Sequence, residues 1–357
     1  MQQSVLDQMQ QMGHEQVVYC QDPHTGLKAI IAIHNTTLGP SLGGTRLWNY
    51  NNHEDALIDA LRLSRGMTYK SAISGLNLGG GKAVLIGDAA KLKSEAYWRR
   101  YGKFVNSLNG KYITAEDVNT SAKDMEFIGM ETKFVTGLPE FAGGSGDPSP
   151  FTAYGVYTGM KAAAKNAWGN DSLSDKTVLV QGAGNVGQYL IGYLVKEEVR
   201  VLVCDINEDR LKTAKQKYPV IEVVANDDIF DLEFDIYAPC ALGATVNSDS
   251  ISKMKCHVIA GAANNQLADE NIHGPMLVEK GIIYVPDFLI NAGGIINISV
   301  ELEGYNKERA LSIVEKIYGR TLEIFALAEQ ENVPTQFAAM RIAEKRIKDI
   351  ANLRVGI

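Results

Sequence analysis

Cysteine is scarce in this sequence, and the few cysteines lie far apart. Four occur in 357 residues, and no two of them form a Cys-x-x-Cys pair. This spacing indicates neither a zinc site nor a redox motif, and the six histidines show no metal-ligand spacing either. We therefore expect no bound metal, and we expect the thiols to stay reduced in a cytoplasmic compartment.

An excess of positive charge and long apolar runs are also absent. The net charge is -7, and no block of Lys and Arg reverses it, so we expect no nucleic-acid partner. No apolar run approaches membrane-spanning length, and the first ten residues lack the basic and apolar regions of a signal peptide. The length and the 45 % hydrophobic content are typical of a soluble globular enzyme with two domains.

The first 142 residues alternate short strands with helices. Two apolar runs, Val17–Cys20 and Leu27–Ile33, flank the turn-forming residues Asp22–Gly26 and predict a hairpin. Three glycines within residues 39–44 indicate either backbone close to a ligand or another strand, or a loop rich in turns. His53–Arg65 has the apolar spacing of an amphipathic helix with acids in its first turn.

The stretch Gly66–Asp88 carries two lysines on either side of three glycines. We expect Lys70 just beyond the helix, and Lys82 at the end of a glycine loop, where it opens the buried strand Ala83–Ile86. A lysine among glycine and aliphatic residues loses hydration, which lowers its pKa and favours the neutral amine. A lone loop lysine is usually solvated, but a pair that flanks Gly79–Gly81 points to chemistry.

A strand at Tyr112–Thr114 leads toward Asp117. A carboxylate at the carboxyl end of a strand stands where α/β sheets hold ligands, which makes Asp117 a catalytic candidate. Asp117 or Asn119 could equally cap the next helix, Ser121–Met130, and the sequence leaves both interpretations open.

Gly143–Pro150, rich in glycine and proline, is the clearest break in the chain. We expect a substrate-binding and oligomerisation domain over residues 1–142 and a dinucleotide-binding domain over residues 143–334. The last amphipathic helix, within residues 335–357, has no sheet of its own, and we expect it to pack back on the first domain.

The second domain opens on a dinucleotide-binding pattern. The apolar strand Thr177–Gln181 runs into Gly182-Ala183-Gly184-Asn185-Val186-Gly187 and then a helix. The three glycines allow a tight turn, approach of a pyrophosphate to the backbone, and close packing of the helix on the strand. Asp205 ends the next strand, where such folds bind the ribose hydroxyls. A carboxylate there favours NAD over NADP, although Arg210 follows closely.

Further strand candidates bring the total in this domain to six, the number in a doubly wound dinucleotide fold. They are Val220–Val224, Asp235–Ala238, His257–Ile259 and Ile282–Val285. Loops containing Cys240 and Asn264 follow strand ends and are expected to line the cofactor crevice. A long helical region then reaches from Pro286 to about Glu331. The fold class is therefore predicted as α/β, with an N-terminal α/β domain of mixed sheet, a Rossmann-type NAD-binding domain, and a catalytic cleft separating them.

Four motifs, in this order over essentially the whole chain, resemble the Glu/Leu/Phe/Val amino-acid dehydrogenases. They are Gly66-Met-Thr-Tyr-Lys70, Gly79-Gly-Gly-Lys82, Ala115-Glu-Asp117-Val-Asn119-Thr and the Gly182 fingerprint. Residues 75–82 are similar to the form found in the branched-chain enzymes. The resemblance implies reversible, NAD-dependent oxidative deamination: L-leucine, water and NAD+ give 4-methyl-2-oxopentanoate, ammonium and NADH, with isoleucine and valine also accepted. It also implies a homo-oligomer, often an octamer, without metal.

The resemblance further implies residue roles. Lys70 would bind the substrate carboxylate, Lys82 would activate water during hydrolysis of the imine, and Asp117 would shuttle protons at the amino group. The implied substrate contacts are Leu42, Gly43, Gly44, Met67, Lys70, Ala115, Ile295 and Ile298. The cofactor contacts expected beyond the glycine turn and Asp205 are Thr152, Cys240, Asn264 and Asn291.

The chemistry agrees with these roles. A lysine with a lowered pKa can act as a base near neutral pH; Lys70 would lower the pKa of Lys82 and Asp117 would raise it, and the sequence leaves open which dominates. The uncharged side-chain pocket would reject glutamate strongly, but it separates leucine from valine by only about 1–3 kcal/mol.

Two alternatives stay open beside this prediction. One is a valine or phenylalanine dehydrogenase of the same family, and the other is a non-catalytic NAD-binding sensor, against which the intact Lys70, Lys82 and Asp117 argue. Because the lysines and the glycine fingerprint lie in different predicted domains, we expect catalysis to require closure of the cleft.

Overall fold

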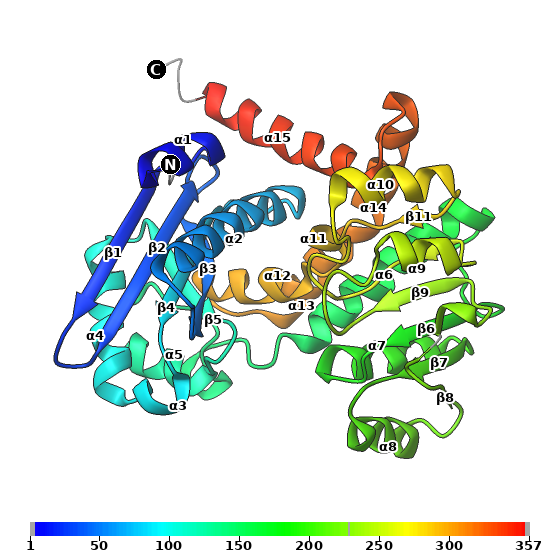
Figure 1. The fold of residues 1–357 in the computed structure, drawn as a ribbon, viewed down its shortest axis with the longest axis horizontal. Coiled ribbons are helices and arrows are strands. Elements are labelled where there is room, and N and C mark those ends of the chain that lie inside the picture. Colours follow the sequence, from blue (N-terminus) through cyan, green and yellow to red (C-terminus); the bar gives the residue numbers. More distant parts are fainter. Residues whose placement is uncertain (1–3, 228, 354–357) are drawn as a thin grey trace. The chain divides into compact units, whose positions relative to one another are not determined.

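The computed structural model describes residues 4–227 and 229–353, and its contacts divide the chain into two compact units (Figure 1). Unit 1 comprises the chain up to Gly146, Ile298–Lys307 and the described residues from Ala343 onward. Unit 2 comprises Asp147–Asn297 and Glu308–Ile342. The chain therefore passes from one unit to the other more than once, whereas the sequence predicted a single return.

Unit 1 is built on a mixed sheet of five strands in the order β1-β2-β4-β3-β5. The strands are β1 Gln16–Asp22, β2 Leu27–Asn35, β3 Ser41–Trp48, β4 Gly79–Ile86 and β5 Tyr112–Glu116. Strands β1 and β2 form the predicted hairpin, and β2 is also antiparallel to β4. Strand β3 lies parallel to both β4 and β5, so the predicted mixed sheet is confirmed.

The helices of this unit cover both faces of its sheet. They are α1 Val5–Met12, α2 His53–Ile73, α3 Ala89–Leu92, α4 Glu95–Ser107 and α5 Ala122–Gly129, with the short η1 Glu140–Ala142. Residues Ala56, Leu57, Ala60 and Leu61 of α2 pack on Ile30, Ala32 and Val84 of the sheet. The opposite face packs against α4 and α5 through residues that include Trp98, Tyr101 and Ile128.

One sequence prediction about the helices of this unit is wrong, and one alternative left open for Asp117 is excluded. Helix α2 does not end at Arg65 but continues to Ile73, so Lys70 lies in its last turn rather than beyond its end. The acid that was weighed as a helix cap, Asp117, does not cap α5. Ser121 does so instead. Its side chain accepts from the backbone nitrogen of Asp124, and the Asp124 side chain accepts from the backbone nitrogen of Ser121.

The three glycines before Lys82 form strand rather than loop. They open β4, where a Cβ atom at Gly79 would lie 1.9 Å from the carbonyl oxygen of Asn35. A Cβ atom at Gly43 of β3 would lie 1.6 Å from the carbonyl oxygen of Gly81. Glycine is needed here because neighbouring backbone, not a turn, occupies the space of a side chain. Of the two interpretations of residues 39–44, close approach to another strand is confirmed.

Unit 2 contains a parallel sheet of six strands in the order β11-β10-β9-β6-β7-β8. The strands are β6 Thr177–Gln181, β7 Arg200–Cys204, β8 Glu222–Val223, β9 Ile236–Pro239, β10 Val258–Ile259 and β11 Ile283–Tyr284. All pairings are parallel. Strands β7 and β8 are added on one side of β6, and β9, β10 and β11 on its other side, so the strand order reverses between β6 and β9. This is the predicted doubly wound dinucleotide fold, confirmed in its number of strands.

Helices connect these strands and continue after the last of them. The connecting elements are α6 Ser149–Trp168, α7 Asn185–Lys196, α8 Glu208–Lys217, η2 Ile229–Asp231, α9 Ser248–Lys253 and α10 Glu270–Glu279. The later elements are α11 Asp287–Ile290, α12 Gly293–Val300, η3 Glu301–Glu303, α13 Lys307–Val314, α14 Lys316–Glu331 and α15 Thr335–Leu353. The helical region predicted from Pro286 is thus interrupted, while its end at Glu331 is confirmed.

The last helix begins in unit 2 and ends in unit 1. Arg346 of α15 donates hydrogen bonds to the carbonyl oxygens of Ala72, Gly75 and Leu76, at and beyond the end of α2. Helix ends leave carbonyl groups without partners, and Arg346 supplies donors to this one. Residues 354–357, at the end of the range predicted for this helix, lie outside the described residues.

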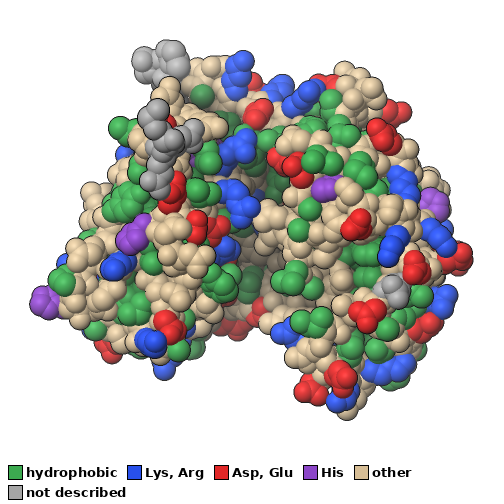
Figure 2. Space-filling view, viewed as in Figure 1, with side chains coloured by type: hydrophobic (Ala, Val, Ile, Leu, Met, Phe, Trp, Pro, Cys, Tyr) green, Lys and Arg blue, Asp and Glu red, His purple; other side chains and the backbone are tan. Residues whose placement is uncertain are grey.

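Charged side chains of both signs lie on the described surface, together with exposed apolar side chains (Figure 2). On the face shown in Figure 2, acidic and basic side chains are interspersed. Among the described residues, no helix combines the length and apolar character required to cross a membrane.

Candidate active site

An ion pair between a buried lysine and a half-buried aspartate joins the centre of the unit 1 sheet to the loop after β5. Lys82 lies within β4, opposite Ala32 of β2, and its side chain is 6 % exposed. Its Nζ atom lies 2.8 Å from Oδ2 of Asp117, which follows β5. The strand order brings these two residues together, because β4 and β5 both flank β3. A charged lysine in a sheet interior is costly unless it is paired, and Asp117 is its partner.

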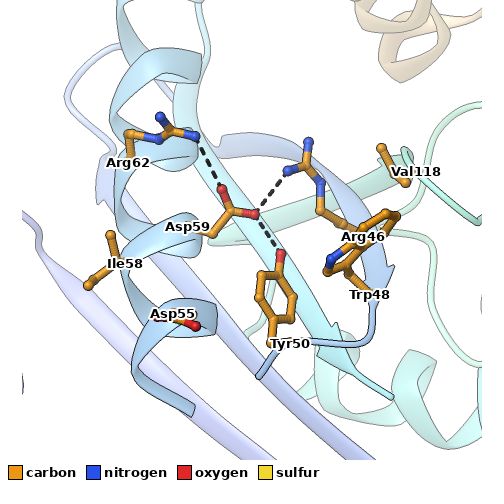
Figure 3. Close-up of a pocket in the computed structure, with 8 residues that line it drawn as sticks. All are labelled: Arg46, Trp48, Tyr50, Asp55, Ile58, Asp59, Arg62 and Val118. Carbon is orange, nitrogen blue, oxygen red and sulfur yellow. Dashed lines mark hydrogen bonds and ion pairs between the residues drawn. The ribbon is translucent and has the colours of Figure 1, made fainter. Parts of the chain in front are cut away.

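Arg46 extends this pair into a network of charges. Its Nε atom donates to Oδ2 of Asp117 at 2.9 Å, and its Nη1 atom donates to Oδ2 of Asp59 at 2.9 Å. The hydroxyl of Tyr50 donates to the same oxygen of Asp59 at 2.5 Å (Figure 3). Arg46 is therefore held between two carboxylates, one on α2 and one beside Lys82.

Burial and charge act on the two members of the pair in different ways. Burial lowers the pKa of Lys82 and outweighs the opposing effect of Asp117, while Arg46 adds to the lowering. Burial alone would raise the pKa of Asp117, but Lys82 and Arg46 together lower it to about 2. Asp117 is therefore ionised at neutral pH in this state, and Lys82 is more easily deprotonated than an ordinary lysine.

The turn that carries Asp117 is fixed by hydrogen bonds and by a glycine. The backbone nitrogen of Asp117 donates to Oγ1 of Thr120 at 2.7 Å, and that hydroxyl donates to the carbonyl oxygen of Thr45 at 3.1 Å. The amide of Asn119 donates to the carbonyl oxygen of Leu47 at 3.0 Å. A Cβ atom at Gly44 would lie 2.8 Å from Cβ of Asp117. Glycine at position 44 thus lets β3 approach the carboxylate.

The glycine turn of unit 2 has the shape that a pyrophosphate requires. Gly182 has φ +108°, and a Cβ atom at Gly187 would lie 2.0 Å from the carbonyl oxygen of Gly182. A Cβ atom at Gly184 would meet nothing within 4 Å, so the space beside this residue is open. Gly184 is also the N-cap of α7 and provides no side-chain acceptor for the first amides of that helix. Open space at a helix N-terminus fits a bound diphosphate.

Asp205 lies at the end of β7, beside this turn. Its Oδ2 atom accepts from the backbone nitrogen of Ala183 at 2.7 Å, and its Oδ1 atom accepts from the backbone nitrogen of Asn207 at 2.8 Å. Nη1 of Arg210 lies 4.0 Å from Oδ2. The carboxylate therefore braces the glycine turn.

The remaining cofactor candidates come from different segments of unit 2. Cys240 follows β9, and its nitrogen donates to the carbonyl oxygen of Gln181 at 2.8 Å. The Asn291 amide nitrogen donates to Oδ1 of Asn264 at 2.8 Å. Thr152 lies in α6 and faces Gly294 of α12. A Cβ atom at Gly294 would lie 2.9 Å from the hydroxyl oxygen of Thr152. Asn264 and Asn291 are thus brought together by the fold.

Both parts of the chain match family models. Residues 14–134 match the Glu/Leu/Phe/Val dehydrogenase, dimerisation domain, and residues 143–207 and 202–354 match Glutamate/Leucine/Phenylalanine/Valine dehydrogenase. The leucine dehydrogenase of Thermoactinomyces intermedius is 54 % identical over 350 residues, 98 % of this chain and 95 % of that protein. The chain belongs to the Glu/Leu/Phe/Val dehydrogenase family.

Two other relatives show how widely the family's substrates vary. The valine dehydrogenase of Streptomyces albus is 46 % identical to this chain, over 95 % of this chain and 93 % of the Streptomyces protein. The crystal structure of L-tryptophan dehydrogenase from Nostoc punctiforme superposes with a TM-score of 0.87 at 45 % identity, covering 97 % of this chain and 99 % of that one. As a member of the family, the protein is an amino-acid dehydrogenase.

The predicted site residues of this dehydrogenase fall into both units. Unit 1 holds Leu42, Gly43, Gly44, Met67, Lys70, Lys82, Ala115, Asp117 and Ile298. Unit 2 holds Thr152, Gly182, Ala183, Gly184, Asn185, Val186, Gly187, Asp205, Cys240, Asn264, Asn291 and Ile295. Ile295 and Ile298 share helix α12, which crosses the boundary between the units. Direct contacts link Lys82 with Asp117 and Asn264 with Asn291.

Arg46, Asp59 and Tyr50 were not predicted as site residues from the sequence. Lys70 was expected to lower the pKa of Lys82, and Arg46, which contacts Asp117 directly, is a cation that lowers it. A signal was present in the sequence, because Arg46 follows Gly44 by two residues. Alternate residues of a strand share a face, so a charge at this position lies on the same side of β3 as Gly44.

Proposed function

We propose that the protein catalyses the reversible, NAD-dependent oxidative deamination of branched-chain L-amino acids. Leucine is the main substrate, with isoleucine and valine also accepted. The identity with leucine dehydrogenases over nearly the whole chain supports this assignment, and it is higher than the identity with the valine enzymes. The overall reaction converts L-leucine, water and NAD+ into 4-methyl-2-oxopentanoate, ammonium, NADH and a proton.

The observation that carries the proposal is the buried pair of Lys82 and Asp117. Hydrolysis of an imine needs a base that can take a proton from water near neutral pH. Burial lowers the pKa of Lys82, so its neutral amine is accessible for this task. A surface lysine would be protonated almost completely at the same pH.

Asp117 serves the amino group in this proposal. Its ionised carboxylate, with a pKa of about 2, attracts the ammonium of the incoming amino acid. It becomes a better proton acceptor when Lys82 loses its charge, because Lys82 is one of the two cations that hold its pKa low. Proton transfer at the amino group is thereby coupled to the protonation of Lys82.

Other residues bind and select the substrate. Lys70, in the last turn of α2, holds the α-carboxylate, while the apolar side chains of Leu42, Ala115, Ile295 and Ile298 receive the branched side chain. Since these four residues carry no charge, glutamate is a poor substrate. Valine differs from leucine by one methylene, so discrimination between them is about 10- to 100-fold at most.

NAD would supply the hydride acceptor for this reaction. Gly182–Gly187 would hold its diphosphate, Asp205 would accept from the adenosine ribose, and Asn264, Asn291, Thr152 and Cys240 would line the remainder of its site. A carboxylate at position 205 favours NAD over NADP because it repels a 2′-phosphate. That the two units close on each other during turnover stays a prediction.

Assembly and location belong to the same proposal. The chain forms a homo-oligomer, consistent with the match of residues 14–134 to a dimerisation domain, and the octamer is the predicted form. The four cysteines are free thiols, as expected in the cytoplasm.

An absorbance assay for NADH tests the proposal. The enzyme is incubated with NAD or NADP and a panel that contains leucine, isoleucine, valine, phenylalanine, glutamate and tryptophan. We expect the highest kcat/KM with leucine and NAD, and loss of deamination in Lys82→Ala. Preference for valine or phenylalanine would replace leucine in the assignment. Retention of activity in Lys82→Ala would refute the mechanism, and absence of leucine-dependent NADH formation would favour the sensor.

A further inference from the structure

Two cations bind one and the same oxygen of Asp117. Nζ of Lys82 lies 2.8 Å and Nε of Arg46 lies 2.9 Å from Oδ2. Among residues 4–227 and 229–353, no hydrogen bond or ion pair reaches the other oxygen, Oδ1, and the Asp117 side chain is 26 % exposed. The carboxylate is thus fixed through one oxygen, while its other oxygen remains available.

Arg46 owes its position to a second carboxylate. Its guanidinium donates through Nη1 to Asp59, and Tyr50 donates to the same Oδ2 of Asp59, as the converging dashed lines in Figure 3 show. The Asp59 side chain is 14 % exposed and the Arg46 side chain 24 % exposed. A pocket of about 510 Å³, lined by residues that include Trp48, Ile58 and Val118, lies on this side of the network. Arg46 and Asp59 are themselves among the residues that line this pocket.

We propose that Arg46 is a positioning residue of the active site, held in place by Asp59 and Tyr50, which fixes Oδ2 of Asp117 and so presents Oδ1 to the amino group of the substrate. Arg46 acts through Asp117 and does not touch the substrate. The inference rests on the proposed function, because it assigns Oδ1 a partner in that reaction.

The same geometry makes Arg46 and Asp59 act on Lys82 with opposite sign. Since two nitrogens share one oxygen, the charges of Arg46 and Lys82 lie within about 6 Å, close enough to influence each other's protonation. Arg46 lowers the pKa of Lys82, and Asp59 raises it. The other titratable groups near this network are Asp117, Tyr50, Tyr112 and Arg62.

The test is the pH profile of kcat/KM for leucine oxidation in Arg46→Gln and Asp59→Asn. The rising limb reports loss of a proton from the catalytic base. Removal of the Arg46 charge shifts this limb to higher pH, and removal of the Asp59 charge shifts it to lower pH. Arg46→Gln also lowers kcat/KM about 100-fold, because Asp117 is no longer held in register. If the substitutions only destabilised the protein, both variants would lose activity, but their rising limbs would not shift in opposite directions.

Arg62→Gln is the matched control. Arg62 pairs with Asp59 as well, but through Oδ1 at 3.6 Å, and its side chain is 66 % exposed. We expect its profile to follow that of the wild type, because a solvated charge outside the network has little influence. A profile that moves as far as that of Asp59→Asn would overturn the inference.

A second variant keeps the test decisive if Arg46→Gln does not fold. Arg46→Lys retains the charge but cannot donate to Asp117 and Asp59 in two directions from one planar group. We expect an unshifted pH profile with a lowered kcat. Unchanged kcat in Arg46→Lys, or a wild-type profile in Arg46→Gln, would refute the positioning role. Failure of the proposed function is recognised separately, since the wild type would then form no NADH with leucine.

Discussion

Gly80 and Thr68 are so close that a Cβ atom added at Gly80 would lie 2.2 Å from the backbone nitrogen of Thr68. The same atom would lie 2.4 Å from the carbonyl oxygen of Ser64, which also belongs to α2. Helix α2 therefore packs directly on the backbone of β4, two residues before Lys82. We predict that Gly80→Ala destabilises the protein by about 3 kcal/mol, as expected when a rigid neighbour must move. Urea denaturation measures the change.

Gly66→Ala provides the control, because it adds the same methyl group on α2, the helix that packs on Gly80 of β4. A Cβ atom at Gly66 meets nothing within 4 Å. Alanine in a helix interior is favoured over glycine by about 0.5–1 kcal/mol, so this variant should be slightly more stable than the wild type. Equal effects of the two substitutions would show that close packing at Gly80 is not what requires glycine.

A second prediction concerns Arg346, which supplies hydrogen bonds to the end of α2. Its Nη1 atom donates to the carbonyl oxygens of Leu76 at 2.7 Å and Ala72 at 3.1 Å. Arg346→Ala leaves these carbonyls without that donor and should cost about 1–3 kcal/mol of stability. Because Lys70 lies in the last turn of α2, we also expect KM for leucine to rise more than kcat falls.

Lys345→Ala separates this effect from a general loss of charge on α15. The Lys345 side chain is 79 % exposed and pairs only with Asp349 among the described ion pairs. Surface pairs of this kind contribute little, so we expect stability and KM to stay at wild-type values. An equal rise of KM in both variants would contradict a specific role for Arg346.

The dinucleotide fold could be predicted from the sequence because its signals are local. The glycine turn after Thr177–Gln181 and the acid at Asp205 belong to one strand–helix–strand unit, in which Asp205 contacts the turn. All six strands of unit 2 were predicted, although β8, β10 and β11 are each only two residues long. For β9 and β10 the apolar composition was sufficient, since both faces of a parallel sheet are buried.

The glycines of unit 1 led to wrong predictions of local structure, because their conformation depends on contacts between distant segments. A Gly-Gly-Gly run favours a loop when only local propensity is considered. In the fold, Gly79–Gly81 are strand residues whose missing side chains are replaced by α2, β2 and the ring of Tyr112. Gly66 likewise indicated a helix end but lies inside α2, where tertiary packing overrides its propensity. Contacts between distant segments decide both cases.

In the candidate active site, too, some residues carry a local sequence signal, whereas others are brought in only by contacts between distant segments. Lys82 and Asp117 could be selected because each stands out in its own segment. Their partner Arg46 could not be paired with Asp117 without the strand order, since the two residues are separated by 71 positions. Asp59 appeared only as one acid on an amphipathic helix. The network is a property of the fold, and its members become evident once β3 is placed between β4 and β5.

A third prediction is that stability falls in mild acid because of His34. Its Nε2 atom lies 3.0 Å from the carbonyl oxygen of Met12, and its Nδ1 atom 2.8 Å from Oγ1 of Thr68. Burial lowers its pKa from 6.5 to about 4, and Arg65 adds to the lowering. Between these values the unfolded chain binds a proton that the folded chain does not. The contribution of neutral His34 to the free energy of unfolding is therefore fully present above pH 6.5 and is lost as the pH falls toward 4.

The effect can be measured as the urea midpoint between pH 7.5 and 4.5. For one proton the slope is at most about 1.4 kcal/mol per pH unit, and His14, whose pKa burial and His34 also lower to about 4, adds to it. His34→Gln should flatten the profile, whereas His24→Gln, in the exposed turn between β1 and β2, should leave its slope unchanged. A slope that His34→Gln does not alter would assign the acid sensitivity to other groups.

The last prediction concerns the choice of cofactor at Asp205 and Arg210. Asp205 is held by the backbone nitrogens of Ala183 and Asn207, so its charge is fixed beside the glycine turn. Arg210 lies 4.0 Å away with a side chain that is 56 % exposed, and it could attract a 2′-phosphate. We expect wild-type kcat/KM to be higher with NAD than with NADP. Asp205→Ala should lower kcat/KM with NAD about 10- to 100-fold, since a hydrogen bond to a charged group is lost.

Arg210→Ala should act on the other cofactor alone. Removal of its charge is expected to reduce the remaining activity with NADP about tenfold, while activity with NAD stays unchanged. Lys212→Ala is the matched control, because Lys212 lies on the same helix with a side chain that is 65 % exposed and pairs with Glu208 and Asp209. If Arg210→Ala raised NADP activity, or if Lys212→Ala lowered it equally, Arg210 would not be the residue that admits a 2′-phosphate. Cofactor preference would then depend on Asp205 without a local counter-charge.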